Sequence, residues 1–313
     1  MATQQTPKPS IAIIGVGQVG GAAAYALILS SVASELILVD IRSGVRDAQV
    51  RDLTDAAYAC NSGTRVRAGT HHEARECDIV VITAGSRYSM GETSMQHRYR
   101  HIAILRGVLE AMRPFKRDAI LLVVANPVDL LTSIAHEISG LPSSQVLGSG
   151  TFLDSVRLRG LLSEATGVST NSIDLYVLGV HGPSQVAAWS TATIGGMPVD
   201  KVLQPETFDR AQLANQCRHR SESIILAKGA TPLGIGSIVT SICASIAGDK
   251  RNVRPISCYQ PEYGCCFSLP VVLGRNGIER RLAVPIDQEE KDAIRESAEA
   301  LKQTLDQIHD AEK

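Results

Sequence analysis

The sequence predicts an α/β fold: a doubly wound parallel sheet followed by an α+β domain. Apolar runs typical of buried strands alternate with helical patterns through the first half, as in parallel sheets covered on both faces. A glycine-rich segment, GVGQVG, directly follows the first strand candidate. Beyond about residue 150 the pattern changes to short strand-like runs, long helices and a turn signal at Asn276-Gly277. We therefore expect two domains, 1–148 and 149–313.

Strands and helices of the first half follow from short apolar runs and from helical periodicity. The strand candidates are 10–15, 35–40, 65–69, 78–83 and 119–125, and the helix candidates are 18–31, 43–60, 93–113 and 128–139. Gly, Pro and Ser crowd residues 140–150 and interrupt the alternation. A helix is predicted from about residue 151, with Thr151 as its N-cap and Asp154 as the acid at N3.

Elements of the second half are less regular. Strand-like runs at 172–180 and 184–194 meet at His181-Gly182-Pro183. Helices are predicted over 205–230 and 234–247, hairpin strands over 252–258, 265–274 and 278–284, and a polar helix from about 287.

Composition excludes several classes of protein. The chain has 313 residues, of which 44% are hydrophobic and 20% charged, and its net charge is −1. These values are typical of a globular protein, and without a basic stripe we expect neither nucleic acid nor membrane as a partner. The N-terminus has no apolar stretch typical of a signal peptide. The seven cysteines lack zinc-ligand spacing, and we interpret them, the adjacent Cys265 and Cys266 included, as reduced thiols of a cytoplasmic protein without a metal site.

The glycine-rich segment has the form and context of a dinucleotide-binding fingerprint. Gly15 permits a tight turn, Gly17 lets the backbone approach a pyrophosphate, and Gly20 lets helix and strand pack closely. Asp40 ends the next strand candidate, twenty residues beyond Gly20, where an acid binds the ribose. The alternative is a glycine-rich turn without a ligand. An acid at residue 40 favours NAD over NADP, although Arg42 and Arg46 lie nearby.

Three further residues suggest hydride-transfer chemistry on a hydroxy acid. Asp154 and Arg157 are three residues apart on a predicted helix and share one face. Such a guanidinium can bind a carboxylate, and an adjacent acid can orient an imidazole such as that of His181. Taken singly, an Asp-x-x-Arg pair is more often a surface ion pair and a lone histidine more often structural. The three residues indicate a catalytic site only in combination, in this order along the chain, and after a first half that has the pattern of a Rossmann nucleotide-binding fold.

Blocks of sequence along the chain, from about Ile11 to Ile308, resemble the lactate/malate dehydrogenase family, and most closely its L-lactate dehydrogenase branch. The resembling blocks are GVGQVG (15–20), ITAGSR (82–87), ANPVDLLT (125–132), LGSGTFLDSVRLR (147–159), GVHGPSQVAAWS (179–190), KGATPLGIG (228–236) and VVLGRNGIER (271–280). The resemblance implies a Rossmann domain followed by an α+β substrate domain, with NAD as the cofactor.

Residue roles follow from the resemblance position by position. It implies His181 as the acid/base, Asp154 as the group that orients it, and Arg157 as the clamp for a substrate carboxylate. It places Asn126 beside nicotinamide and substrate and Thr231 in the substrate pocket. The cofactor-binding positions that it implies are Gly15, Gly17, Gln18, Val19, Gly20, Asp40, Thr83, Ala84, Gly85 and Asn126. The implied partners are a small carboxylate substrate and further copies of the chain, as a homotetramer or homodimer.

Departures from the family pattern occur around the substrate. The family's mobile loop reads G-E-[ST]-R, and its arginine polarises the substrate carbonyl, whereas this chain has Ser94 in that position. Tyr88 stands where lactate-specific members have glutamine and malate-specific ones arginine. Pro183 replaces an aspartate, and Leu233 replaces a pocket residue. Arg87 and Arg98 are candidate substitutes for the missing arginine, and the alternative is that both are solvated charges.

Three functions remain open from the sequence. The first is an NAD-dependent 2-hydroxy-acid dehydrogenase with altered substrate specificity. The second is a reductase of a cyclic imine or another ketone acid, because an iminium already carries the positive charge that the loop arginine would supply. The third is an NAD-binding protein that has lost turnover, which Ser94 and Pro183 favour.

Overall fold

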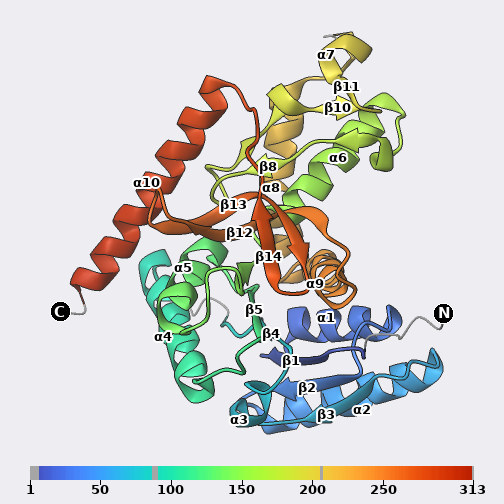
Figure 1. Cartoon of the computed structure of the whole chain (residues 1–313), viewed down its shortest axis with the longest axis vertical. Helices are drawn as coiled ribbons and strands as arrows, with labels where there is room; N and C mark the ends of the chain where they lie inside the picture. The colour runs from blue at the N-terminus through green and yellow to red at the C-terminus, as the bar shows by residue number, and fades with distance from the viewer. Residues whose placement is uncertain (1–6, 87–90, 205–206, 312–313) are drawn as a thin grey trace.

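The computed structural model describes residues 7–86, 91–204 and 207–311, and in these ranges nine strands form one central sheet (Figure 1). The strand order is β14-β13-β12-β6-β5-β4-β1-β2-β3. The first six strands along the chain are parallel: β1 (Ser10–Ile14), β2 (Glu35–Val39), β3 (Arg65–Ala68), β4 (Ile79–Ile82), β5 (Ile120–Val123) and β6 (Val146–Gly148). Their order, 3-2-1-4-5-6, is that of a doubly wound nucleotide-binding sheet.

Alternate side chains of each strand pack on opposite faces of this sheet. Ala12 and Ile14 of β1 belong to one buried cluster, while Ile11 and Ile13 belong to another. The first face is covered by α3 (His71–Ala74), α4 (Ser94–Met112), α5 (Val128–Ile138) and α10 (Gln288–Asp310). The second face is covered by α1 (Gln18–Leu29), α2 (Ser43–Ala59) and α9 (Pro232–Ala247). The predicted α/β class, with a doubly wound parallel sheet, is confirmed.

Three strands of the second half extend the same sheet. β12 (Asn252–Gln260), β13 (Cys265–Gly274) and β14 (Gly277–Arg281) form an antiparallel meander. β12 joins β6 through the antiparallel pair Ser257 and Gly148. The sequence pattern missed β6, because a three-residue strand inside a segment rich in Gly, Pro and Ser has no recognisable period. The sheet thus runs across the expected boundary between residues 148 and 149, and the division into two domains stays a prediction.

The remaining elements surround a third buried cluster. They are α6 (Phe152–Thr166), α7 (Val199–Val202), α8 (Arg210–Lys228) and the short strands β7 (Ile173–Asp174), β8 (Val177–Leu178), β9 (Val186–Ala187), β10 (Thr193–Ile194) and β11 (Met197–Pro198). The two long strands expected at 172–180 and 184–194 are therefore wrong in detail. Gly179 and Gly182, at φ +81° and +123°, interrupt extended backbone on either side of His181. Figure 1 shows this part above the sheet, with α10 along its side.

Two other expectations concern cysteines and membranes. Cys265 and Cys266 are fully buried in β13, and all seven cysteines are free, as expected. No helix in the described ranges has both the length and the apolar character to cross a bilayer.

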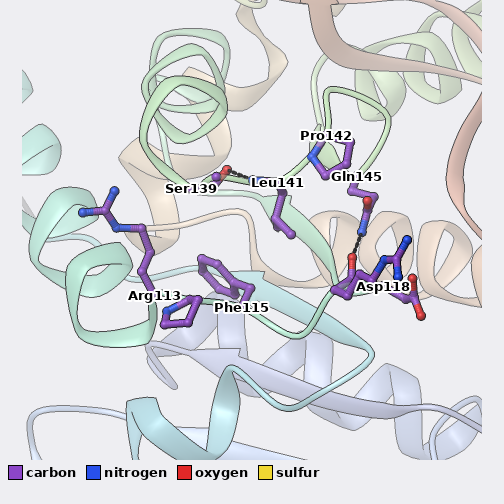
Figure 2. Close-up of a pocket in the computed structure, with 10 residues that line it drawn as sticks. Arg113, Phe115, Asp118, Ser139, Leu141, Pro142 and Gln145 are labelled. Atoms are coloured by element: carbon purple, nitrogen blue, oxygen red, sulfur yellow. Dashed lines mark hydrogen bonds between the residues drawn. The ribbon is translucent and has the colours of Figure 1, made fainter.

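A groove of about 770 Å³ lies away from the predicted site residues (Figure 2). Its walls are the connections that precede β5 and β6, so it opens near the amino ends of those strands. Phe115 and Leu141 face each other across it, and Arg113 turns aside to donate from Nη1 to the Ile138 carbonyl at 2.8 Å. None of the predicted site residues lines this groove.

Candidate active site

The glycine-rich loop between β1 and α1 has the shape that its sequence predicts. A Cβ on Gly15, whose φ is +89°, would lie 2.5 Å from the Cα of Ala84, and one on Gly20 would lie 2.1 Å from the Gly15 carbonyl oxygen. Both positions therefore require glycine for close packing. A Cβ on Gly17 would meet only Arg42 Nη2, 4.0 Å away. The backbone at Gly17 is thus open to a ligand, as a pyrophosphate requires.

The first turn of α1 is available for an anion. Gly17 is the N-cap and supplies no side-chain cap, so the free N–H groups of the turn that begins with Gln18 and Val19 can bind phosphate. Thr83, just after β4, donates from Oγ1 to the Gly15 carbonyl at 2.6 Å and so joins the glycine-rich loop to the end of β4. Gly85 packs against His101, because a Cβ there would lie 2.9 Å from Cε1 of that ring.

Asp40 follows β2 at the far side of this loop. Its side chain is 6% exposed, and its two carboxylate oxygens accept the backbone N–H groups of Val16 and Arg42, both at 2.9 Å. Arg42 also donates from Nε to Asp40 at 3.4 Å, whereas Arg46 pairs with its neighbour Asp47. These features fit a bound dinucleotide. The backbone at Gly17 and the first turn of α1 would bind its pyrophosphate, and Asp40 would bind its ribose.

The structure brings His181, Asp154 and Arg157 together. His181 follows β8, while Asp154 and Arg157 lie in the first two turns of α6. His181 Nδ1 lies 2.8 Å from Asp154 Oδ2, and Arg157 Nη1 donates to Asp154 Oδ1 at 3.3 Å. The Asp154 and Arg157 side chains are 2% and 9% exposed, whereas that of His181 is 25% exposed. Asp154 is therefore an internal group that faces two cationic side chains, and His181 is the one that solvent or a ligand reaches.

The charges in this cluster shift both titrations. Burial alone would raise the pKa of Asp154, but the hydrogen bond from His181 and the charges of His181 and Arg157 hold it below its ordinary value. Burial would likewise lower the pKa of His181. The hydrogen bond to Asp154 and the negative charges of Asp154 and Asp129 outweigh burial and raise that pKa. The arrangement favours an imidazolium in contact with a carboxylate.

Hydrogen bonds to β8 hold the start of α6. Thr151 Oγ1 donates to the Val177 carbonyl at 2.5 Å, and Ser155 Oγ accepts the Val177 N–H at 2.8 Å. Thr151 is the N-cap residue of α6 and Asp154 lies in its first turn, as predicted, but the Thr151 hydroxyl is used in this cross-link and makes no cap bond to the helix. The cross-link joins the helix that carries Asp154 to the strand that leads to His181.

The other predicted residues lie at ends of elements. Asn126 lies in the connection between β5 and α5, Thr231 precedes α9, and Ser94 is the exposed first residue of α4. In the described ranges none of these three side chains is hydrogen bonded to His181, Asp154 or Arg157. Arg98 is half-buried one turn beyond Ser94. Tyr88 and Arg87 lie outside the described residues.

Sequence reasoning missed two residues that contact this cluster. Ser221 of α8 accepts a hydrogen bond from Arg157 Nη1 at 2.5 Å, and Asp129 of α5 accepts the backbone N–H of His181 at 2.6 Å through Oδ2. Asp129 carries a signal that could have revealed it, since an acid within a run of apolar helix residues needs a buried partner. Ser221 carries none, because it lies on a helix with many polar residues.

Comparisons with known proteins agree with this geometry. Residues 9–148 match the lactate/malate dehydrogenase NAD binding domain, and residues 151–312 match the alpha/beta C-terminal domain of the same family. The L-lactate dehydrogenase A of Rhizopus oryzae is 42% identical over 292 residues, 93% of this chain and 91% of that protein. The L-lactate dehydrogenase of Synechococcus sp. (strain JA-3-3Ab) is 39% identical over 303 residues, 95% of this chain and 98% of that protein.

A solved structure extends the likeness to three dimensions. The minor L-lactate dehydrogenase from Enterococcus mundtii superposes with a TM-score of 0.91 at 32% identity, covering 96% of this chain and 98% of that one. The resemblance inferred from the sequence blocks is thereby confirmed, and so is NAD as the cofactor. This chain belongs to the lactate/malate dehydrogenase family and is an NAD-dependent oxidoreductase.

Proposed function

We propose that this oxidoreductase interconverts a 2-oxo acid and the corresponding L-2-hydroxy acid. The observation that carries the proposal is the joint contact of Asp154 with His181 and Arg157, at 2.8 and 3.3 Å. A proton donor and a carboxylate-binding cation are thereby held next to each other. Reduction of a 2-oxo acid uses both groups, one for its carbonyl oxygen and one for its carboxylate. NAD would be held by the glycine loop, the first turn of α1 and Asp40.

His181 would carry the proton. A carboxylate can only accept a hydrogen bond, so the Asp154 contact places a proton on Nδ1 and leaves Nε2 for the substrate. Bound NADH supplies the hydride to the carbonyl carbon. As the carbon gains its C–H bond, the π electron pair of the C=O bond would move to oxygen, which would take the Nε2 proton and become a hydroxyl, leaving the imidazole neutral. In the opposite direction the neutral ring removes that proton.

Arg157 would bind the substrate carboxylate. Its Nη1 is engaged by Asp154 and Ser221, which leaves the edge formed by Nε and Nη2. That edge presents two parallel N–H groups, the arrangement that binds a carboxylate in bidentate fashion. Low exposure of the guanidinium strengthens such a contact by excluding water.

The substrate specificity of this chain would differ from that of its lactate dehydrogenase relatives. Ser94, at the exposed start of α4, occupies the position to which the resemblance assigns the carbonyl-polarising arginine. A serine supplies no fixed charge to a developing alkoxide, and loss of one such donor costs about 10²–10³ in rate. Ser94 also supports a second candidate, a reductase of a cyclic imine, because a protonated imine needs no added positive charge.

A substrate panel tests these alternatives. The purified chain would be incubated with NADH and 2-oxo acids of increasing side-chain size, and with a cyclic imino acid, while the reduced nicotinamide is followed by absorbance. We expect turnover of at least one 2-oxo acid, with pyruvate not the best. Turnover of the imine alone would establish the second candidate. Binding of NADH without any turnover would overturn the proposal and leave an NAD-binding protein.

We also infer that the chain forms a homodimer or homotetramer in the cytoplasm. Tyr25 and Leu29, four residues apart on α1, are 46% and 53% exposed. Large apolar side chains on one exposed helix face are typical of surfaces covered by another subunit. Light scattering coupled to gel filtration measures the mass in solution. A monomer at micromolar concentration would contradict this inference.

A further inference from the structure

A second buried acid lies beside His181 and has no part in the mechanism above. Asp129 is in the first turn of α5 and is 3% exposed. Its Oδ2 accepts the backbone N–H of His181 at 2.6 Å. Asp154 holds the ring of the same histidine through Nδ1. His181 is therefore held by two carboxyl groups from two helices, one through its main chain and one through its side chain.

The second oxygen of Asp129 faces the sheet. Asp129 Oδ1 and the Ser257 hydroxyl of β12 are both buried, and in the described ranges neither makes a hydrogen bond of ordinary geometry. The Ser257 hydroxyl is nevertheless close enough to favour the ionised form of Asp129. Burial raises the pKa of Asp129 to about 6, against the opposing effects of Ser257 and of His181. The group is thus ionised above that pH and neutral below it.

The charged surroundings of Asp129 come from few elements. His181 faces it from the loop after β8, and Asp154 and Arg157 lie beyond the imidazole on α6. The thiols of Cys258 on β12 and of Cys265 and Cys266 on β13 are also near. Burial raises the pKa of Cys258 and Cys265 to about 12 and that of Cys266 further, so all three stay neutral. Among the described groups near Asp129, His181 is therefore the one whose charge changes as the pH rises through its raised pKa.

We propose that Asp129 is a positioning residue for the proton donor: it fixes the main chain of His181 and, when ionised, stabilises the imidazolium in addition to Asp154. The proposal rests on the function proposed above, in which His181 donates the proton. Loss of the carboxyl would leave a buried N–H without an acceptor, and loss of the charge alone would weaken the imidazolium.

Two substitutions separate these effects. Asp129→Asn keeps an acceptor oxygen for the His181 N–H and removes the charge, whereas Asp129→Ala removes both. The histidine Cε1–H signals of the isotope-labelled full chain would be titrated by NMR, and the His181 signal would be assigned by its loss in His181→Asn. We expect the pKa of His181 to fall by about 1 unit in Asp129→Asn. Below the pKa of Asp129 the two proteins should titrate alike.

The pH profile of kcat/KM for reduction provides the second readout. In Asp129→Asn the fall in kcat/KM should move to lower pH by the same amount, with the low-pH plateau and the KM for NADH retained. In Asp129→Ala the low-pH value of kcat/KM should fall as well. Asparagine would then restore the hydrogen bond to the His181 N–H but not the negative charge. An unchanged pKa of His181 in folded Asp129→Asn would overturn the claim that the charge of Asp129 stabilises the imidazolium. An unchanged low-pH value of kcat/KM in Asp129→Ala would overturn the claim that Asp129 positions His181.

A third variant keeps the proposal testable if neither substitution folds. Ser257→Ala removes the hydroxyl that favours ionised Asp129, so the pKa of Asp129 should rise and that of His181 should fall, in the same direction as in Asp129→Asn. No change in the His181 titration of folded Ser257→Ala would count against the proposal. The NMR titration requires no turnover, so absence of 2-oxo-acid reduction would contradict the proposed function without deciding the role of Asp129.

Discussion

Arg157 and Ser221 are 64 positions apart in the chain, and the guanidinium Nη1 donates to the serine hydroxyl across a distance of 2.5 Å. The bond joins α6 to α8 and fixes the plane of the guanidinium. Because Nη1 donates to both Asp154 and Ser221, we expect a carboxylate to bind at the edge formed by Nε and Nη2. We therefore expect Ser221 to affect substrate binding through Arg157, without contacting the substrate itself.

Replacement of Ser221 should weaken substrate binding. In Ser221→Ala we expect the KM for the 2-oxo acid to rise about fivefold, the equivalent of ~1 kcal/mol for one lost hydrogen bond, with little change in kcat. Steady-state kinetics at saturating NADH measures both values. Ser223→Ala is the matched control, because that exposed hydroxyl, on the same helix, donates to the Arg220 carbonyl. Equal KM values in Ser221→Ala and the control would refute the role.

His181 should be indispensable for turnover but not for cofactor binding. In His181→Asn we expect reduction to fall by about 10²–10⁴-fold, the usual contribution of a positioned proton donor. The Kd for NADH should stay within a factor of two or so, since the ring is not part of the glycine loop. Nicotinamide fluorescence and stopped-flow turnover measure the two quantities. Near-normal turnover by His181→Asn would contradict the mechanism in which His181 donates the proton.

The pH dependence of reduction should follow the imidazolium of His181. Because its neighbours raise the pKa of His181 above the ordinary 6.5, the protonated ring persists to higher pH. The rate of reduction should fall as the pH rises through that pKa, and the rate of oxidation should rise over the same interval.

Asp154→Asn supplies the matched test of that dependence. It removes the hydrogen-bonded charge that raises the pKa of His181, so the fall in reduction should move to lower pH. Profiles of kcat/KM for the parent and the variant would show the displacement. A displacement to higher pH would contradict the assignment.

Cofactor choice should depend on Asp40. Its carboxylate repels a 2′-phosphate, so we expect NADH to bind at least about ten times more tightly than NADPH. Asp40→Asn keeps an acceptor oxygen for the loop and should narrow that ratio. Asp47→Asn, which alters the acid paired with Arg46, serves as the control. Equal affinities for the two cofactors in the parent protein would refute the role of Asp40.

Ser94→Arg tests whether the site has been rebuilt for another substrate. Residue 94 is exposed, and the Thr93–Gln96 capping box holds the start of α4 independently of its side chain. We therefore expect a folded variant that remains poor with pyruvate and loses activity with the native substrate. Met95→Arg, at the next exposed position, controls for added charge. A large gain with pyruvate, already the best substrate of the parent, would show that the site is an ordinary one that lacks its arginine.

Local sequence patterns were sufficient to predict five of the six parallel strands. Four of these five strands are mainly apolar runs, β3 (RVRA) being the exception, and Gly15 and Gly20 have close contacts that admit no side chain. β6 escaped prediction because it becomes a strand by lying between β5 and β12, and β12 is about a hundred residues further along the chain. Its stability is a tertiary property, which no local pattern contains.

Prediction of the candidate site was limited in the same way. The contact of His181 with Asp154 could be expected because a family resemblance supplied it. Thr151 is the N-cap residue that the spacing predicted, but the spacing does not reveal that a strand carbonyl takes its hydroxyl. Ser221 and Asp129 reach the site from α8 and α5, and their contacts exist only once the helices have packed.

The unbroken sheet from β3 to β14 has a mechanical consequence. The pair of Ser257 with Gly148 joins the two halves of the chain by backbone hydrogen bonding at the centre of the molecule, so the halves have no hinge there. We therefore expect ligands to be enclosed by the connecting segments above the sheet, and not by rotation of the two halves toward each other. Amide exchange would show this as slow, uniform protection through β5, β6 and β12, with ligand-dependent changes confined to the connections above them.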